Sequence, residues 1–87
     1  MDWLSLEGIP RVKASYQVWK RCKRILRYTR KHPLVTRQTV RFLKEDVQNE
    51  YEELVDAILS LNRDEFRQLL TELKPGRLYD IACSLEN

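Results

Sequence analysis

The sequence contains few of the residues that interrupt helices, and it shows no pattern typical of β-strands. Only two glycines and three prolines occur among its 87 residues. No internal repeat or low-complexity segment is present, and no apolar run is long enough to cross a bilayer. Charged residues make up 33% of the chain, and the apolar residues are spaced rather than clustered. These features predict a soluble all-α protein rather than a disordered one.

Residues suited to catalysis or metal binding are also scarce. His32 is the only histidine, and its place before a proline favours an exposed or helix-capping side chain. Cys22 and Cys83 form neither a disulfide framework nor a metal-binding pattern, so we expect small buried thiols in a reducing compartment. Paired acids such as Glu52 and Glu53 point away from each other on a helix, and no glycine-rich loop is present to bind a phosphate. We therefore expect no enzymatic activity, no metal site and no cofactor of the protein's own.

The N-terminal ten residues do not resemble a targeting signal. They contain Asp2 and Glu7, and they lack the basic start and the apolar core of a secretory signal. They also make a poor mitochondrial presequence, because such segments are poor in acids. A mature protein, or one targeted by an internal segment, would show the same features.

Acidic residues are missing from a long stretch of the chain. Between Arg11 and Lys44 there are twelve Lys or Arg and no Asp or Glu, whereas residues 45–87 hold eleven acids and four bases. The net charge of +3 conceals this segregation. One interpretation is that the two halves fold onto each other and partly neutralise. The other is that the basic half faces an acidic partner.

A first helix is predicted from about Val12 to Lys31, after an N-terminal arm of residues 1–11. Its apolar face recurs at steps of three and four and comprises Val12, Tyr16, Trp19, Cys22, Leu26 and Thr29. Ser15 is an alternative N-cap if the helix begins later. Pro33 ends the helix, because the residue before a proline is disfavoured in the α conformation.

A second, long helix is predicted from Thr36, its N-cap, to about Leu61. No glycine or proline interrupts it, although Asn49 and Ser60 are positions for a weak break. Its apolar residues follow a heptad-like spacing: Val40, Leu43, Val47, Tyr51, Leu54, Ile58 and Leu61.

Two shorter helices follow. Asn62 and Glu65 form a capping-box pattern that opens the third helix, and the run Lys74–Gly76 ends it. A short fourth helix is predicted at about Arg77–Leu85. The fold class is therefore a small antiparallel three-helix bundle with a short C-terminal fourth helix, in one domain of residues 12–87. A chain of this size buries only about 60–65% of its unfolded surface, which favours a partner that shares the core.

The basic first helix is the candidate docking surface. Its predicted partner-binding residues are Lys20, Arg21, Lys23, Arg24, Arg27, Arg30 and Lys31. Such a cluster also suits RNA, with Tyr28 available for stacking, but the acidic second half would repel a polyanion. Membrane-surface binding by this helix is a further alternative, although its apolar face is needed for the core.

Several motifs along the chain match a known pattern in part. Ile25-Leu26-Arg27 is followed by Arg30-Lys31-His32-Pro33, and the second helix carries Val47-Gln48-Asn49-Glu50-Tyr51. The first two runs resemble the first helix of the LYR-motif (complex I LYR) family, in which an aliphatic pair with Arg and a basic segment follow a Leu-Tyr-Arg triplet. The third run is similar to the family's aliphatic-x-x-Glu-Phe motif, a few residues late. The triplet falls either on Arg21-Cys22-Lys23, where only the basic third residue is kept, or on Val18-Trp19-Lys20, with the rest shifted by one turn.

The resemblance covers about half of the chain and implies a non-enzymatic adaptor with an antiparallel three-helix fold. Members of the family are accessory subunits or assembly factors of larger mitochondrial complexes. The resemblance therefore implies a place on the matrix side of the mitochondrion. It also implies an acidic partner such as acyl carrier protein, which carries an acyl-phosphopantetheine and docks on the basic first helix. The alternatives from the residues alone are a small basic protein that binds RNA or ribonucleoprotein, and a soluble regulatory interaction module.

Overall fold

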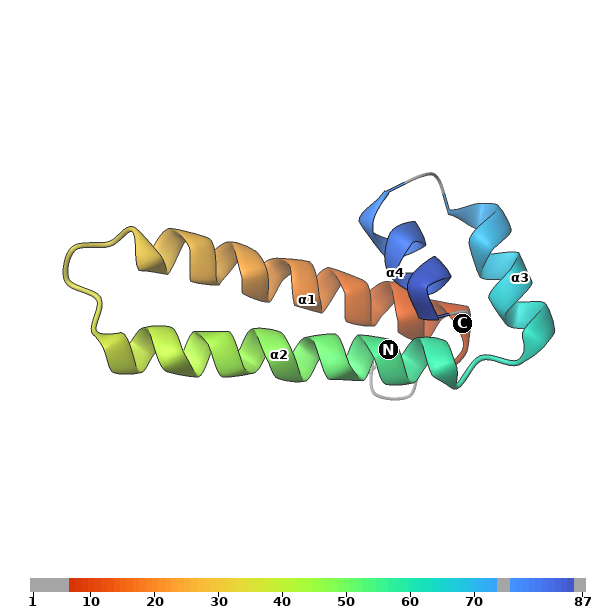
Figure 1. Ribbon diagram of the computed structural model, residues 1–87, viewed down its shortest axis with the longest axis horizontal. Coiled ribbons are helices and arrows are strands. Elements are labelled where there is room, and N and C mark those ends of the chain that lie inside the picture. Colours follow the sequence, from red (N-terminus) through yellow and green to blue (C-terminus); the bar gives the residue numbers. More distant parts are fainter. Residues whose placement is uncertain (1–6, 74–75, 86–87) are drawn as a thin grey trace.

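The computed structural model describes residues 7–73 and 76–85, which form four helices and no strand (Figure 1). In chain order the helices are α1 (Ile9–Arg30), α2 (Arg37–Leu59), α3 (Arg63–Glu72) and α4 (Arg77–Leu85). The prediction of an all-α fold is thus confirmed for this part of the chain. Most of the predicted N-terminal arm lies outside the described residues, as do Lys74 and Pro75 of the predicted stop after the third helix.

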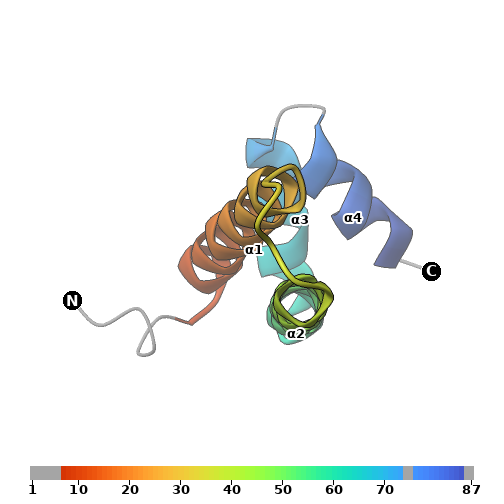
Figure 2. The ribbon, with the colours of Figure 1, turned by 90° about the vertical axis from the view of Figure 1, so that its left-hand side faces the viewer.

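Helices α1 and α2 form a long hairpin that determines the shape of the molecule. They lie side by side, run in opposite directions and are joined by a turn at residues 31–36 (Figures 1 and 2). The rings of Trp19 and Tyr51 lie 5.5 Å apart between the two helices. Nearer the chain start, a guanidinium nitrogen of Arg11 lies 3.1 Å from a carboxylate oxygen of Asp56. The molecule is accordingly elongated, with extents of 48 × 28 × 20 Å.

The first helix begins at Ile9, three residues before its predicted start, so residues 9–11 belong to α1 rather than to an arm. Pro10 lies in the first turn, where its missing N–H leaves no helical hydrogen bond unmade. Gly8 precedes the helix with φ 69°, and a Cβ at this position would lie 2.7 Å from Oε2 of Glu65. The positive φ therefore favours glycine here, whereas the Glu65 carboxylate, at the end of a flexible side chain, could move aside. The alternative cap Ser15 was wrong, because Ser15 is a buried residue inside the helix.

The second helix is continuous from Arg37 to Leu59, and Asn49 does not break it. The predicted N-cap is confirmed, since Oγ1 of Thr36 accepts a hydrogen bond from the backbone N–H of Thr39 at 3.2 Å. Ser60 is the C-cap residue, and its backbone N–H still donates to the carbonyl of Asp56. The long helix predicted from the heptad-like spacing therefore ends two residues before Leu61.

The third and fourth helices are short and pack at one end of the hairpin (Figure 1). The predicted capping box is confirmed: the side chain of Asn62 accepts from the N–H of Glu65 at 2.8 Å, and the Glu65 side chain accepts from the N–H of Asn62 at 3.2 Å. The fourth helix has the predicted bounds. Seen along the hairpin, α4 lies to one side of α1 and α2 (Figure 2).

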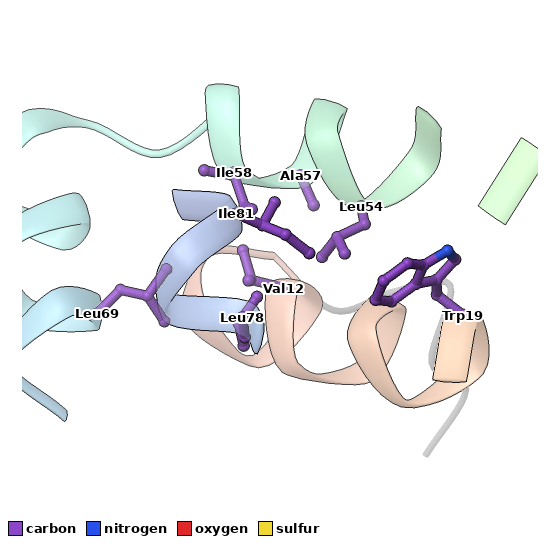
Figure 3. Close-up of a cluster of buried hydrophobic side chains, with 8 residues drawn as sticks. All are labelled: Val12, Trp19, Leu54, Ala57, Ile58, Leu69, Leu78 and Ile81. Atoms are coloured by element: carbon purple, nitrogen blue, oxygen red, sulfur yellow. The ribbon is translucent and has the colours of Figure 1, made fainter. Parts of the chain in front are cut away.

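The buried core lies where these four helices meet (Figure 3). Its apolar members are Val12, Trp19, Leu54, Ala57, Ile58, Leu69, Leu78, Ile81 and Ala82. Val12, Leu54 and Leu69 have no exposed surface at all. Burying an aliphatic side chain of this kind stabilises a fold by about 1.5–3 kcal/mol, so this end of the molecule contains most of its stability.

None of the helices within the described ranges, 7–73 and 76–85, combines the length and the apolar character required to cross a membrane.

Candidate functional site

The hairpin has two halves that differ in burial. No residue from Lys20 to Glu53 is buried, although α1 and α2 continue together through this stretch. We call residues 20–53 the open half. We call the rest of the hairpin, with α3 and α4 packed on it, the covered half. The seam between the two helices in the open half is only half-buried, because no third element lies over it (Figure 1).

A groove with basic walls runs along the open half. It has a volume of about 600 Å³ and is lined by Lys20, Lys23, Arg24, Leu26, Arg27, Tyr28, Arg30, Lys31 and Val47. Leu26 of α1 and Val47 of α2 are half-buried and supply apolar surface, whereas six cations supply the walls. We call this feature the basic groove. Its combination of apolar surface and cations suits an acidic ligand that also has an apolar face.

Six of the seven predicted docking residues line the basic groove, and Arg21 does not. Arg21 is exposed on α1, and its side chain is not among those that line the groove. Helical spacing does not separate it from the lining, since Arg21 is three residues before Arg24 and seven before Tyr28, and both of these line the groove. The sequence identified the right helix but included one residue that does not line the groove.

Lys23 of the basic groove also belongs to an aromatic and cationic cluster at the boundary with the covered half. Nζ of Lys23 lies 4.4 Å from the ring centroid of Trp19, and the guanidinium carbon of Arg77 lies 5.9 Å from it. Burial lowers the pKa of Lys23, and the nearby charges of Arg77 and Arg27 lower it further. The lowered pKa of Lys23 thus reflects first the burial of its ammonium group and then the neighbouring cations.

The cations of the groove have no acidic partner among the described residues. The three ion pairs found there all belong to Arg11 and Lys13, which contact Glu53, Asp56 and Glu72. Direct ion pairing between the two halves of the chain is therefore found, among the described residues, at the start of α1. Arg27 and Arg30 lie in the last turn of α1, where the negative end of the helix dipole stabilises positive charge. The helix end thus favours the charge of these two arginines, which stay exposed.

A second basic hollow, of about 350 Å³, lies at the start of α2. Its cations are Arg37, Arg41 and Lys44, and Val35 and Val40 contribute its apolar surface. These three bases were absent from the predicted site, which was restricted to the first helix. The signal that would have found them was already visible, because the stretch without acids extends to Lys44 rather than ending at Pro33.

The remaining candidate residues have structural surroundings. Cys22 and Cys83 are free and only partly buried, so the expectation of fully buried thiols was too strong. Burial raises the pKa of Cys22, and the carboxylates of Glu50 and Asp46 raise it further, which keeps the thiol protonated and poorly nucleophilic.

His32 is exposed, as predicted, and its Nδ1 accepts a hydrogen bond from the backbone N–H of Leu34 in the turn at 3.2 Å rather than capping the end of α1. Within the described ranges, no group of three or more His, Cys, Asp or Glu is placed to hold a metal ion.

Comparison of the chain with protein-family models, with curated proteins and with solved structures gave no match.

Proposed function

We propose that this protein is a non-enzymatic adaptor, an accessory subunit or assembly factor of a larger mitochondrial complex, which docks an acidic protein partner in the basic groove. One observation carries the proposal. The seam between α1 and α2 in residues 20–53 is only half-buried and is bordered by six cations without acidic partners among the described residues. A hairpin that leaves such a seam open gains stability from a partner that covers it.

The shape of the groove favours an acidic amphipathic helix as the bound element. In the covered half, α4 lies over the hairpin and its first residue, Arg77, contacts Trp19. Beyond Trp19 the same hairpin continues without a covering helix. A partner helix in the groove would place its apolar face on Leu26 and Val47 and its carboxylates against Lys20, Arg24 and the other cations. The antiparallel three-helix bundle expected from the sequence would then be completed along the open half by the partner.

Acyl carrier protein is the specific partner that we propose. Its acidic surface matches the groove, and the resemblance of Ile25–Pro33 and Val47–Tyr51 to the LYR-motif family supports the choice. The acyl-phosphopantetheine would belong to the partner rather than to this chain. The family resemblance also supports a place on the matrix side of the mitochondrion. The main alternative partner is RNA, for which the exposed Tyr28 ring, at 68% of its full exposure, offers a stacking surface.

The test is a binding measurement with purified components. Phosphopantetheinylated acyl carrier protein is titrated into the full chain, and the complex is identified by intact-mass spectrometry. We expect the double charge reversal Arg24→Glu with Arg27→Glu to weaken binding about a hundredfold, because both residues line the groove. The matched control is Arg63→Glu with Arg67→Glu, two exposed arginines of α3 in the covered half.

Circular dichroism must show that both double variants keep the helical content of the parent. Equal affinity of the groove variant and the parent for acyl carrier protein would contradict the proposed docking site. No binding of acyl carrier protein, together with groove-dependent binding of a single-stranded RNA, would replace the adaptor hypothesis with the RNA hypothesis.

A further inference from the structure

The turn of the hairpin carries large apolar side chains that neither the core nor the two hollows account for. Leu34 is 84% exposed, the highest value among the exposed large apolar residues of the described chain. Phe42, on the first turns of α2, is 57% exposed. Neither residue lines the basic groove or the second hollow. We call residues 30–44, which hold both side chains, the tip.

The exposure of Leu34 results from an ordered turn. The backbone N–H of Leu34 donates to Nδ1 of His32, and the N–H of Val35 donates to the carbonyl of His32 at 3.2 Å. Thr36 then caps α2. Three successive local hydrogen bonds therefore hold the turn in a conformation that points a leucine into solvent.

The charges around the tip are all of one sign. Its cations are Arg30, Lys31, Arg37, Arg41 and Lys44. No acid occurs between Glu7 and Glu45, and the acids of α2, α3 and α4 follow from Glu45 onward, toward the end of the hairpin where α3 and α4 pack (Figure 1). The charge segregation of the sequence thus becomes a dipole along a molecule 48 Å long. Such a dipole would orient the hairpin with its tip toward an anionic surface.

We propose that the tip binds the surface of an anionic lipid bilayer. Leu34 enters the interface between headgroups and acyl chains, Phe42 and Tyr28 lie at headgroup level, and the five tip cations contact lipid phosphates. Tyr28 is two residues before the end of α1, and Phe42 is five residues after the start of α2. Both rings therefore lie within about 8 Å of the turn along the helix axes, which is within the depth of such an interface.

The arrangement of the apolar groups favours a membrane over a macromolecular ligand. Tyr28, Leu34 and Phe42 belong to three different elements, α1, the turn and α2, and they do not converge on a shared hollow. A bilayer admits each side chain separately and needs no shared hollow, which suits this scattered arrangement. An aliphatic group at the most exposed position contributes nothing to binding a nucleic acid, where aromatic stacking and phosphate contacts dominate. The proposal concerns residues outside the basic groove for the most part, and it does not depend on the adaptor function.

The test is co-sedimentation of the full chain with vesicles of phosphatidylcholine, alone or mixed with phosphatidylglycerol. We expect binding only to the mixed vesicles, with an affinity that falls as salt is raised. Leu34→Ser should weaken this binding about tenfold, as expected for losing the transfer of a leucine side chain. Leu59→Ser is the matched control, because Leu59 is 62% exposed at the opposite end of α2, and it should change binding less than twofold.

A charge test separates this proposal from the adaptor function. Arg37→Glu with Arg41→Glu should abolish vesicle binding and leave the affinity for acyl carrier protein within about threefold of the parent, because neither residue lines the basic groove. The α3 pair Arg63→Glu with Arg67→Glu should leave vesicle binding in place. Absence of binding to the mixed vesicles at low salt would overturn the proposal. So would an equal effect of Leu34→Ser and Leu59→Ser.

Discussion

The open and covered halves of the hairpin consist of the same two helices, yet only one of them has a core. The apolar spacing of α2 continues without a change of period from Val40 and Leu43 through Leu54 and Ile58. Leu54 and Ile58 are buried, whereas Val40 and Leu43 are only half-buried. The difference arises from α3 and α4, which cover one end. An apolar pattern therefore predicts which face of a helix is available for packing, and a third layer decides whether that face becomes a core.

The largest test of this comparison uses two leucines of α2. Leu54→Ala removes a side chain with no exposed surface, and we expect it to lower the free energy of unfolding by about 3 kcal/mol. Leu43→Ala makes the same chemical change in the open half, where the site is half-exposed, and we expect a loss of about 1 kcal/mol. Urea denaturation followed by circular dichroism measures both values. Equal losses would show that the open half is packed as tightly as the covered half.

A second test compares the caps at the two ends. Asn62→Ala removes one partner of the capping box that starts α3, and we expect the free energy of unfolding to fall by about 1 kcal/mol, because α3 supplies part of the core. Thr36→Ala removes the cap of α2 at the tip, where the first turn can fray without exposing the core. We expect a global loss of at most about 0.5 kcal/mol there, together with faster amide hydrogen exchange confined to the first turns of α2.

If Thr36→Ala instead destabilised the protein as much as Asn62→Ala, the tip would be part of the same cooperative unit as the core. That result would weaken the division of the hairpin into two halves.

Local chemistry in the sequence was sufficient to predict most helix boundaries. The cap at Thr36, the box of Asn62 with Glu65 and the bounds of α4 all depend on residues that are neighbours in the chain. The start of α1 was misplaced because residues 1–11 were assigned to an N-terminal arm, although proline is favoured in a first turn, as at Pro10. The sequence thus determined the elements better than their packing.

The candidate site was predicted in part for the same reason. The basic face of α1 follows from helical spacing, so six groove residues were found, and Arg21 was included because charge and spacing alone do not show which side chains line a groove. Arg37, Arg41 and Lys44 line the second hollow rather than the basic groove. Their place beside the end of α1 depends on the hairpin, which brings the start of α2 close to it (Figure 1). The open seam itself was not predicted, because a periodic apolar stripe does not reveal how many helices will cover it.

The smallest expected effect concerns the contact that ties α3 to α1 in the covered half. Nζ of Lys13 lies 3.1 Å from Oε2 of Glu72. The hydrogen bond from Gln68 holds the pKa of Glu72 below its ordinary value of 4.5, and the hydrogen bond and charge of Lys13 lower it further. A carboxylate whose pKa is lower in the folded state stabilises the fold above its unfolded pKa, and this contribution disappears as the pH falls through the folded pKa.

We expect Glu72→Gln to reduce, by a small but measurable amount, the decrease in the free energy of unfolding between neutral and acidic pH. Urea unfolding at a series of pH values provides the measurement, and Glu45→Gln in the open half, where Glu45 has no ion pair among the described residues, is the control. An unchanged pH dependence in Glu72→Gln would mean that the contact between Lys13 and Glu72 contributes nothing to the stability of the covered half.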